Sequence, residues 1–270
     1  MTTTAVRARS TRASHILLSG FLATIALIGV VWWPLLRDYL AGYDPAFPWW
    51  RQTDFLLIGI FAAMTWLIMA RADVRSDARL VAVGLLGGLA IESWGTQTGL
   101  WGYYTQERPP LWILPAWPIA TLSIDRILHA LSSLAPAGRP RLYHWLHLLV
   151  LGGFFLLMLA FVRPTWSEPS TLIALSACAL LIARPTNERT QLLTFAAGTG
   201  LGYFLERWGT TRECWTYYTL QTPPLFAVLA HGMAAVAFWR VLEVSEGWGR
   251  VVASFLRRRR ASSSQAASST

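Results

Sequence analysis

The chain has 270 residues, of which 54% are hydrophobic and only 14% are charged, and its formal net charge is +9. Soluble globular domains carry about 25% charged residues, so the composition argues against an ordinary soluble protein. The positive charge comes from arginine alone, because the chain contains no lysine. No basic helix interleaved with base-stacking aromatic residues occurs outside the apolar segments, so we do not expect nucleic acid as a partner.

The apolar residues form blocks that predict an all-α polytopic membrane protein of about eight transmembrane helices. A helix needs roughly 20 residues to cross the hydrocarbon core, so the shorter blocks must include flanking aromatic and polar residues. Seven spans remain the alternative, if the segment around Thr171 is re-entrant. The eight blocks are residues 16–36, 55–70, 80–91, 111–122, 145–162, 171–183, 192–205 and 225–239.

The first apolar block follows Arg7, Arg9 and Arg12, as the apolar part of a signal peptide would. It ends in Trp32-Trp33-Pro34 without a small-residue cleavage site, so we expect a retained first span. Arginine also predicts the orientation, because it is enriched in cytoplasmic segments. Alternate loops are rich in arginine, which predicts a multi-pass protein of the cell membrane (the inner membrane) with both termini in the cytoplasm.

An internal repeat divides the chain. Residues 92–111 align without a gap on residues 206–225, with eleven identical positions at an offset of 114. We therefore predict two four-helix repeats, 15–135 and 136–256, between a cytoplasmic segment 1–14 and a disordered tail 257–270. The basic tail is expected to touch anionic lipid. Because four helices return the chain to the same side, the repeats should be related by a pseudo-twofold axis along the membrane normal.

Glu92 and Glu206 occupy the same place in the two repeats, near the outer end of the third and seventh predicted helices. Glycines precede each glutamate by four and eight residues: Gly84 and Gly88 in the first repeat, Gly198 and Gly202 in the second. Small residues at this spacing are typical of a close helix–helix contact. We therefore expect both carboxyls inside the bundle, approaching one another through these glycine faces. An ionisable group within a membrane is a functional-site candidate by default.

Tryptophan and tyrosine follow each glutamate at fixed spacing, and a proline pair comes after them. Pro110 and Pro224 are expected to start the fourth helix of each repeat, because proline is well tolerated in the first helical turn. His231 stands in the second repeat where the first has Trp117. The candidate substrate-binding residues are Trp94, Trp101, Tyr103, Tyr104, Trp117, Trp208, Trp215, Tyr217 and Tyr218.

The first motif reads Glu92-x-x-Gly-Thr-x-Thr-Gly-x-x-Gly-x-Tyr-Thr, followed by Pro110-Leu-x-Ile-x-Pro-Ala-Trp117. It resembles the motif of carotenoid-biosynthesis membrane proteins of the carotenoid hydratase type. The resemblance covers roughly 35 of the 270 residues, and it implies protonation or hydration of an isoprenoid double bond without a redox cofactor. The second copy departs from the motif, with Glu213 at the place of Gly99.

Such chemistry requires a neutral acid and an ionised partner. The neighbours of Glu92 in the sequence are uncharged, which favours a neutral carboxylic acid that donates the proton. Arg207 and Arg212 stand near Glu206, which favours a carboxylate acting with His231 as stabiliser or base. Aromatic faces would stabilise the carbocation. Glu92, Glu206 and His231 are therefore the candidate catalytic residues, and the expected substrate is an isoprenoid or another hydrophobic lipid.

The sequence is also compatible with two other functions. The chain could instead transport or bind a small amphiphile, or act as a non-catalytic scaffold in the membrane, with the glutamates and aromatic residues in structural roles. We expect no metal and no cofactor. His144 and His147, with His129, have weak metal-ligand spacing. Cys178 and Cys214 lie at different predicted depths, so we expect no disulfide between them.

Overall fold

The computed structural model describes residues 11–183 and 185–268, with side chains described up to residue 247. These residues form ten α-helices, two short 3-10 helices and two short β-strands, so the predicted all-α class is correct apart from the strands. The first repeat contains α1 (Arg12–Val31), α2 (Trp33–Ala41), α3 (Trp49–Gln52), α4 (Phe55–Met69), α5 (Val74–Gln97), β1 (Trp101–Tyr103), η1 (Leu111–Ile113) and α6 (Ala116–Leu134). The second contains α7 (Pro140–Phe161), η2 (Arg163–Thr165), α8 (Pro169–Ile182), α9 (Glu188–Thr211), β2 (Trp215–Tyr217) and α10 (Leu225–Ser268).

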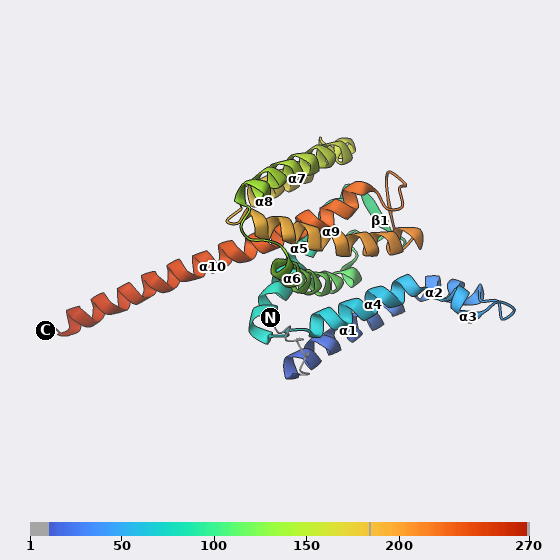
Figure 1. Ribbon diagram of the computed structural model, residues 1–270, viewed down its shortest axis with the longest axis horizontal. Helices are drawn as coiled ribbons and strands as arrows, with labels where there is room; N and C mark the ends of the chain where they lie inside the picture. Colours follow the sequence, from blue (N-terminus) through green and yellow to red (C-terminus); the bar gives the residue numbers. More distant parts are fainter. Residues whose placement is uncertain (1–10, 184, 269–270) are drawn as a thin grey trace.

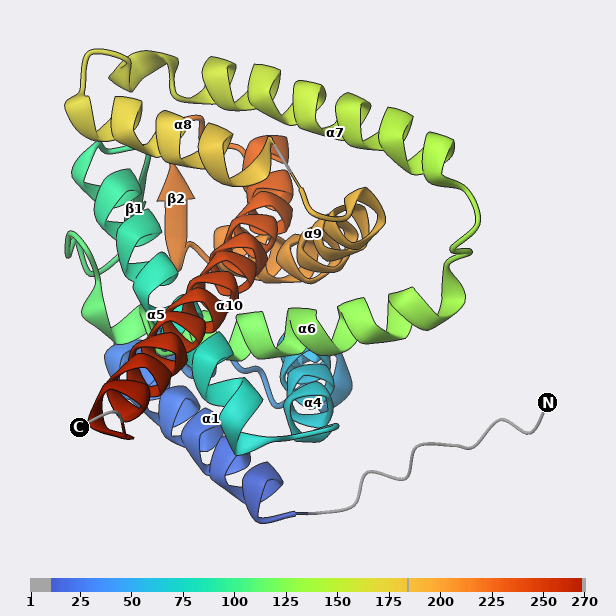
Figure 2. The ribbon, with the colours of Figure 1, turned by 90° about the vertical axis from the view of Figure 1, so that its left-hand side faces the viewer.

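The helices form three groups. α1 and α4 lie side by side on one flank, α7 and α8 lie on the opposite flank, and α5, α6, α9 and α10 form the centre (Figures 1 and 2). α2 has no counterpart of similar length in the second repeat, where only the short 3-10 helix η2 lies between α7 and α8. The two strands lie at one end of the bundle, and the C-terminal half of α10 projects from the other end (Figure 1).

Four helices are long and apolar enough to cross a membrane among the described residues: Arg12–Val31, Leu111–Leu134, Pro140–Phe161 and Leu225–Gly247. α4 and α8 are apolar but have only 15 and 14 residues. α5 and α9 are each 24 residues long, but their ends are polar. The chain is therefore compatible with a membrane protein, because a helix of about 20 apolar residues matches the hydrocarbon thickness.

α5 and α9 extend well beyond their apolar blocks because each begins at an equivalent side-chain cap. The Asp73 carboxylate accepts hydrogen bonds from the backbone N–H groups of Arg75 and Ser76. Asn187, which is 114 residues further on, accepts one from the N–H of Thr190. Such caps satisfy the free N–H groups of the first turn. Both helices also continue past their glutamates, so Glu92 and Glu206 lie within the helices and not at their ends.

The strands β1 and β2 pair with each other across the repeats. They are antiparallel, and Trp101 faces Tyr217, Gly102 faces Thr216, and Tyr103 faces Trp215. Residue 216 is residue 102 plus the repeat offset of 114, so a local twofold axis passes between Gly102 and Thr216. The aromatic segments that follow the two glutamates therefore form one ladder that joins the two halves of the molecule.

The two repeats are also interleaved in the core. α1 and α4 of the first repeat pack in one hydrophobic cluster with Leu201 and Trp208 of the second. Phe154 and Phe226 of the second repeat pack in another cluster with Leu100 of the first. Because each cluster contains side chains from both repeats, neither repeat has a complete core by itself.

Two local expectations need correction. Pro224 directly precedes α10 as expected, but Pro110 is followed by the 3-10 helix η1, and α6 begins only at Ala116. The tail expected to be disordered from residue 257 instead continues α10 as helix to Ser268. Residues 257–268 contain neither proline nor glycine and are rich in alanine and arginine, which favour helix. Residues 269–270 and the N-terminal segment 1–10 lie outside the described residues.

Glu213 provides a test of the repeat geometry. Gly99 has φ +71°, and Glu213 at the equivalent position has φ +55°. The left-handed conformation costs a residue with a Cβ roughly 1–2 kcal/mol, and glycine adopts it freely. We therefore expect Glu213→Gly to raise the free energy of unfolding by about 1 kcal/mol. Gly99→Ala should lower the free energy of unfolding by a similar amount. Thermal unfolding in detergent measures both variants, and a destabilised Glu213→Gly protein would contradict the left-handed conformation at position 213.

Candidate functional site

Glu92 is buried, and it accepts three side-chain hydrogen bonds within its own repeat. The indole N–H of Trp101 donates to Oε2 at 3.0 Å. The hydroxyl of Tyr103 and the indole N–H of Trp117 donate to Oε1, at 2.9 and 3.1 Å. Trp101 and Tyr103 reach the carboxyl because they lie on one face of β1, two residues apart.

Glu206 has the same surroundings with one difference. Trp215 Nε1 donates to Oε2 at 3.0 Å, and the Tyr217 hydroxyl donates to Oε1 at 2.8 Å. The third partner is His231, whose Nε2 lies 2.9 Å from Oε1. The two carboxyls are therefore held by equivalent groups, except that an imidazole replaces an indole in the second repeat.

Glycine three residues after each glutamate makes room for the tryptophan of the strand. A Cβ added at Gly95 would lie 1.9 Å from Cη2 of Trp101, and one at Gly209 would lie 1.9 Å from Cη2 of Trp215. Each indole therefore lies directly on the helix backbone, within reach of its carboxyl. Glycine at this spacing in both copies is the sequence signal for the contact.

The sequence suggested that the glycines before the glutamates bring α5 and α9 together. They do not. Cβ atoms added at Gly84 and Gly88 would meet Pro118 and Trp117 of α6. In the second repeat, Gly198 and Gly202 face Gly232 and His231 of α10 in the same way. The glycine faces thus pack α5 against α6 in the first repeat and α9 against α10 in the second. Gly88 and Gly202 also provide the space for the rings that bind the carboxyls.

Gly209→Ala tests this contact. The new Cβ would force Trp215 away from Glu206, and overpacking a buried contact costs about 1–3 kcal/mol. We expect a lower unfolding temperature and altered tryptophan fluorescence. Gly200→Ala on the same helix is the matched control, because nothing lies within 4 Å of its added Cβ. Equal effects of the two substitutions would contradict the packing of Trp215 on the helix.

The two carboxyl sites meet through the rings of Trp117 and His231. These rings stack across the repeats, with centroids 6.0 Å apart and planes inclined by 19°. The strand aromatics also meet across the axis: Trp101 lies 6.1 Å from Tyr217 and Tyr103 lies 6.0 Å from Trp215, between ring centroids. The side chains around Glu92 and Glu206 therefore form one continuous group of polar and aromatic residues.

The hydrogen-bond donors differ in what they permit. An indole N–H can only donate, so Trp101 and Trp117 require Glu92 to accept on both of its oxygens. Imidazole can donate or accept and can hold an added proton. Among the three partners of Glu206, His231 is the one whose ring can both donate and accept a proton. Glu92 is therefore held by two indoles and a tyrosine, whereas Glu206 shares a hydrogen bond with an imidazole that can exchange a proton with it.

Both sites line a cavity of about 810 Å³. Its walls come from the flanking helices of both repeats and from the central helices, and they are mainly aliphatic and aromatic. Ligand cavities have volumes of roughly 300–1,000 Å³, so this one has room for a sizeable molecule. Among the proposed site residues, the cavity is lined by Glu92, Trp94, Trp101, Tyr103, Trp117, Glu206, Trp208, Trp215, Tyr217 and His231.

Tyr104 and Tyr218 do not belong to this site. Each hydroxyl instead donates to the last residue of the first helix of its repeat: Tyr104 to the carbonyl of Val31, and Tyr218 to that of Phe161 at 2.7 Å. Successive residues of a strand point to opposite faces. Tyr103 and Tyr217 therefore face the carboxyls, and the tyrosines that follow them face away.

The arginines expected beside Glu206 are also elsewhere. Arg207 donates to the carbonyl of Thr222 at 3.2 Å, and Arg212 pairs with Asp54, the N-cap residue of α4, at 3.1 Å. The Asp54 carboxylate also accepts the indole N–H of Trp208 at 3.0 Å, which ties the second repeat to the first. The expectation of an arginine-paired Glu206 is therefore wrong, and the side chain that contacts its carboxyl in their place is His231.

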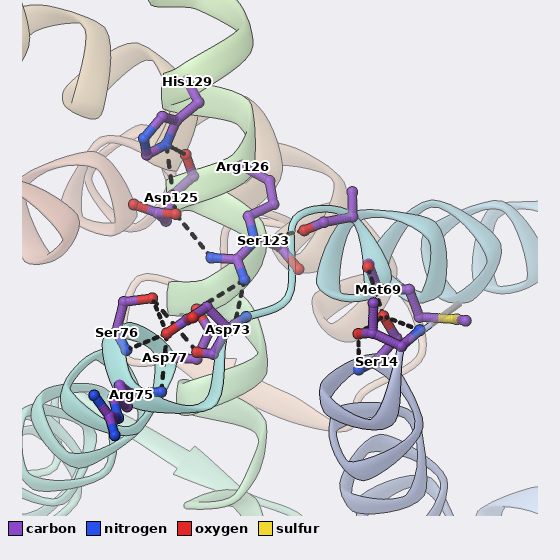
Figure 3. A network of polar contacts seen from close by, with 12 residues as sticks. Ser14, Met69, Asp73, Arg75, Ser76, Asp77, Ser123, Asp125, Arg126 and His129 are labelled. Atoms are coloured by element: carbon purple, nitrogen blue, oxygen red, sulfur yellow. Dashed lines mark hydrogen bonds and ion pairs between the residues drawn. The ribbon is translucent and has the colours of Figure 1, made fainter. Parts of the chain in front are cut away.

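A second polar cluster lies at the other end of α5 and α6, around Asp77, Asp125 and Arg126 (Figure 3). One Arg126 nitrogen, Nη2, lies 2.8 Å from each oxygen of Asp77, and both side chains are buried. Arg126 also contacts Asp125 at 2.8 Å and donates to the carbonyl of Ala70 at 3.0 Å. The cluster does not line the large cavity.

The remaining candidates have simple structural partners. His144 Nδ1 lies 2.8 Å from Glu188, and His129 Nδ1 lies 2.8 Å from the carbonyl of its own helix at Asp125. Within the described residues, no group of three or more potential ligands is arranged to hold a metal ion. Cys178 and Cys214 are free thiols, and Cys178 lines the cavity.

Comparison with models of protein families, with curated proteins and with solved structures found no match to this chain. The resemblance to carotenoid hydratases therefore rests on the first motif alone.

Proposed function

We propose that the protein is a membrane-embedded acid–base enzyme that acts on an isoprenoid or another long hydrophobic lipid without a cofactor. One observation carries the proposal: two carboxyl groups from symmetry-related helices line the same large and mainly apolar cavity. Burying a carboxyl group costs free energy, and such groups in membrane helices often mark functional sites. The short likeness of the Glu92 motif to carotenoid hydratases points to the same class of substrate.

We propose separate roles for the two carboxyls, the reverse of those expected from the sequence, because only Glu206 has an imidazole among its hydrogen-bond partners. The Glu206–His231 pair holds the proton and delivers it to one carbon of a C=C bond. The resulting carbocation is stabilised by the Glu92 carboxyl and by the faces of Trp101 and Trp215. Water or a neighbouring double bond then captures the cation, and a proton returns to the Glu206–His231 pair. The reaction is thus a hydration or a cyclisation with no change in overall redox state.

We further propose that α4, α5, α8 and α9 also cross the membrane, which gives eight spans. Both termini would then be cytoplasmic, and the β1–β2 ladder would lie at the outer end. Gln106 and Gln221 are exposed on the segments that follow the two strands. Single cysteines at these positions, in a protein without Cys178 and Cys214, should react with an impermeant maleimide added to intact cells. Labelling only after lysis would show that these segments face the cytoplasm, which would contradict the proposed orientation.

The function is tested by comparing pigment and lipid extracts of a host strain with and without the gene. We expect the strain without the gene to accumulate a precursor that lacks one hydration or one ring, and the wild-type gene to restore the product. Identical extracts in the two strains would contradict the enzyme and favour a transporter or a scaffold.

A further inference from the structure

The cavity reaches the side of the bundle between α5 and α8. Leu86 on α5 and Ile173 on α8 both line the cavity, and they are 66% and 69% exposed. Ala90 and Ala177 line the same gap and are also exposed. At the outer end the gap is bounded by a hydrogen bond between Trp94 and Thr171, at 3.1 Å. These four gap residues are named the lateral portal below.

The twofold-related gap, between α4 and α9, does not open into the cavity. The positions related to Leu86, Ala90, Ile173 and Ala177 are Gly200, Phe204, Gly59 and Ala63, and none of these four lines the cavity.

The outer ends of the two gaps also differ. The α4–α9 gap is held by Asp54, which binds both Arg212 and Trp208. On the portal side the related positions are Glu168 and Thr98, and no ion pair joins α5 to α8 among the described residues. The symmetry of the repeats is thus broken where the cavity meets the surface, because the Asp54–Arg212 ion pair joins the helices on one side and has no equivalent on the portal side within the described part of the chain.

We propose that the lateral portal admits an elongated, uncharged apolar lipid sideways from the bilayer. All four portal side chains are aliphatic, so an ionic headgroup would lose its hydration there without gaining a partner. Gln97 and Ser170 line the cavity near the outer end of the same gap. Their side chains can bind one uncharged polar group, such as a hydroxyl. The lipid class follows from the proposed function, but entry through this gap follows from the cavity and its walls.

The test is photolabelling with a diazirine-bearing analogue of geranylgeraniol in vesicles of phosphatidylethanolamine and phosphatidylglycerol. The full-length protein is labelled and the modified peptides are identified by mass spectrometry. We expect label on α5 and α8 at the portal, and label deeper in the cavity on α10 near Met233, which lines it. Ala90→Phe with Ala177→Trp fills the portal and should abolish the deep label.

Ala63→Trp is the matched control, since Ala63 is the twofold counterpart of Ala177 and is equally a surface alanine. It should leave the deep label unchanged. Ala90→Phe alone is a second variant, for use if the double variant does not fold. It places at the portal the phenylalanine that the second repeat has at the equivalent position, Phe204, and it should reduce the deep label. Thermal unfolding of each protein identifies a folding defect.

Undiminished deep labelling in the folded portal variants would overturn the portal, and so would equal loss in Ala63→Trp. Labelling requires entry but no turnover, so its failure is distinguishable from failure of the proposed enzyme. Wild-type labelling with no product in the strain comparison would leave the portal standing and reject the chemistry.

Discussion

Replacing His231 with tryptophan is expected to lower turnover by about 10²–10⁴-fold, the usual contribution of a general acid or base. The substitution copies the first repeat, where the indole of Trp117 binds Glu92 at 3.1 Å. Gly202 leaves the same space beside residue 231 that Gly88 leaves beside Trp117. An indole N–H can therefore still satisfy Glu206, but it cannot deliver or take up a proton at neutral pH.

Product formation per folded protein is the measurement for this variant. His231→Gln is the companion, because its amide also donates a hydrogen bond but does not titrate. Glu206→Gln should cause a comparable loss, whereas Trp117→Phe, which removes one hydrogen bond from Glu92 without removing a titratable group, should have a smaller effect. Wild-type turnover by folded His231→Trp protein would reject the role of the Glu206–His231 pair.

Arg126→Ala is expected to be the most destabilising single substitution of those considered. It would leave Asp77 buried and unpaired, and removing one partner of a buried ion pair costs about 3–5 kcal/mol. The twofold-related Arg240 is the matched control: it pairs with Glu243 at 2.8 Å, and both side chains are partly exposed. Surface pairs contribute about 0–1 kcal/mol, so Arg240→Ala should change stability little.

The second repeat also suggests the rescue. Gln191 replaces Asp77 there, and its amide nitrogen donates to the carbonyl of Ile182 at 2.8 Å. Asp77→Gln combined with Arg126→Leu removes both charges and should recover part of the stability lost in Arg126→Ala. Thermal unfolding in detergent measures all four proteins. If the Arg126→Ala and Arg240→Ala proteins are equally stable, the cluster in Figure 3 does not stabilise the folded protein as its buried contacts imply.

The repeat and the position of its acids could be predicted from sequence, because identical residues at one offset must occupy equivalent places. The partners of the glycine faces could not. Glycine on a helix can admit either another backbone or a large ring, and both leave the same spacing in the sequence. Gly88 admits the ring of Trp117 within its own repeat, and no pattern within one helix distinguishes this from contact with α9.

The partners of the charged side chains could not be predicted from the sequence for a related reason. Arg212 is six residues from Glu206 in the sequence, yet it binds Asp54 in the other repeat. Residues near a helix end can reach several elements, and only the packing of the two repeats decides between them. The buried Asp77–Arg126 pair was missed for the same reason, because its two members lie on different helices and are separated by 48 intervening residues.

Deuterium incorporation tests the central claim most directly. The purified protein, reconstituted in lipid vesicles in D₂O, is given the precursor that accumulates in the strain without the gene, and the product is analysed by mass spectrometry and NMR. Protonation of a C=C bond by the Glu206–His231 pair predicts one deuterium on carbon in each product molecule from the wild-type protein. His231→Trp and Glu206→Gln should give almost no product. Product that carries no deuterium on carbon, or undiminished formation of deuterated product by both variants, would contradict the account.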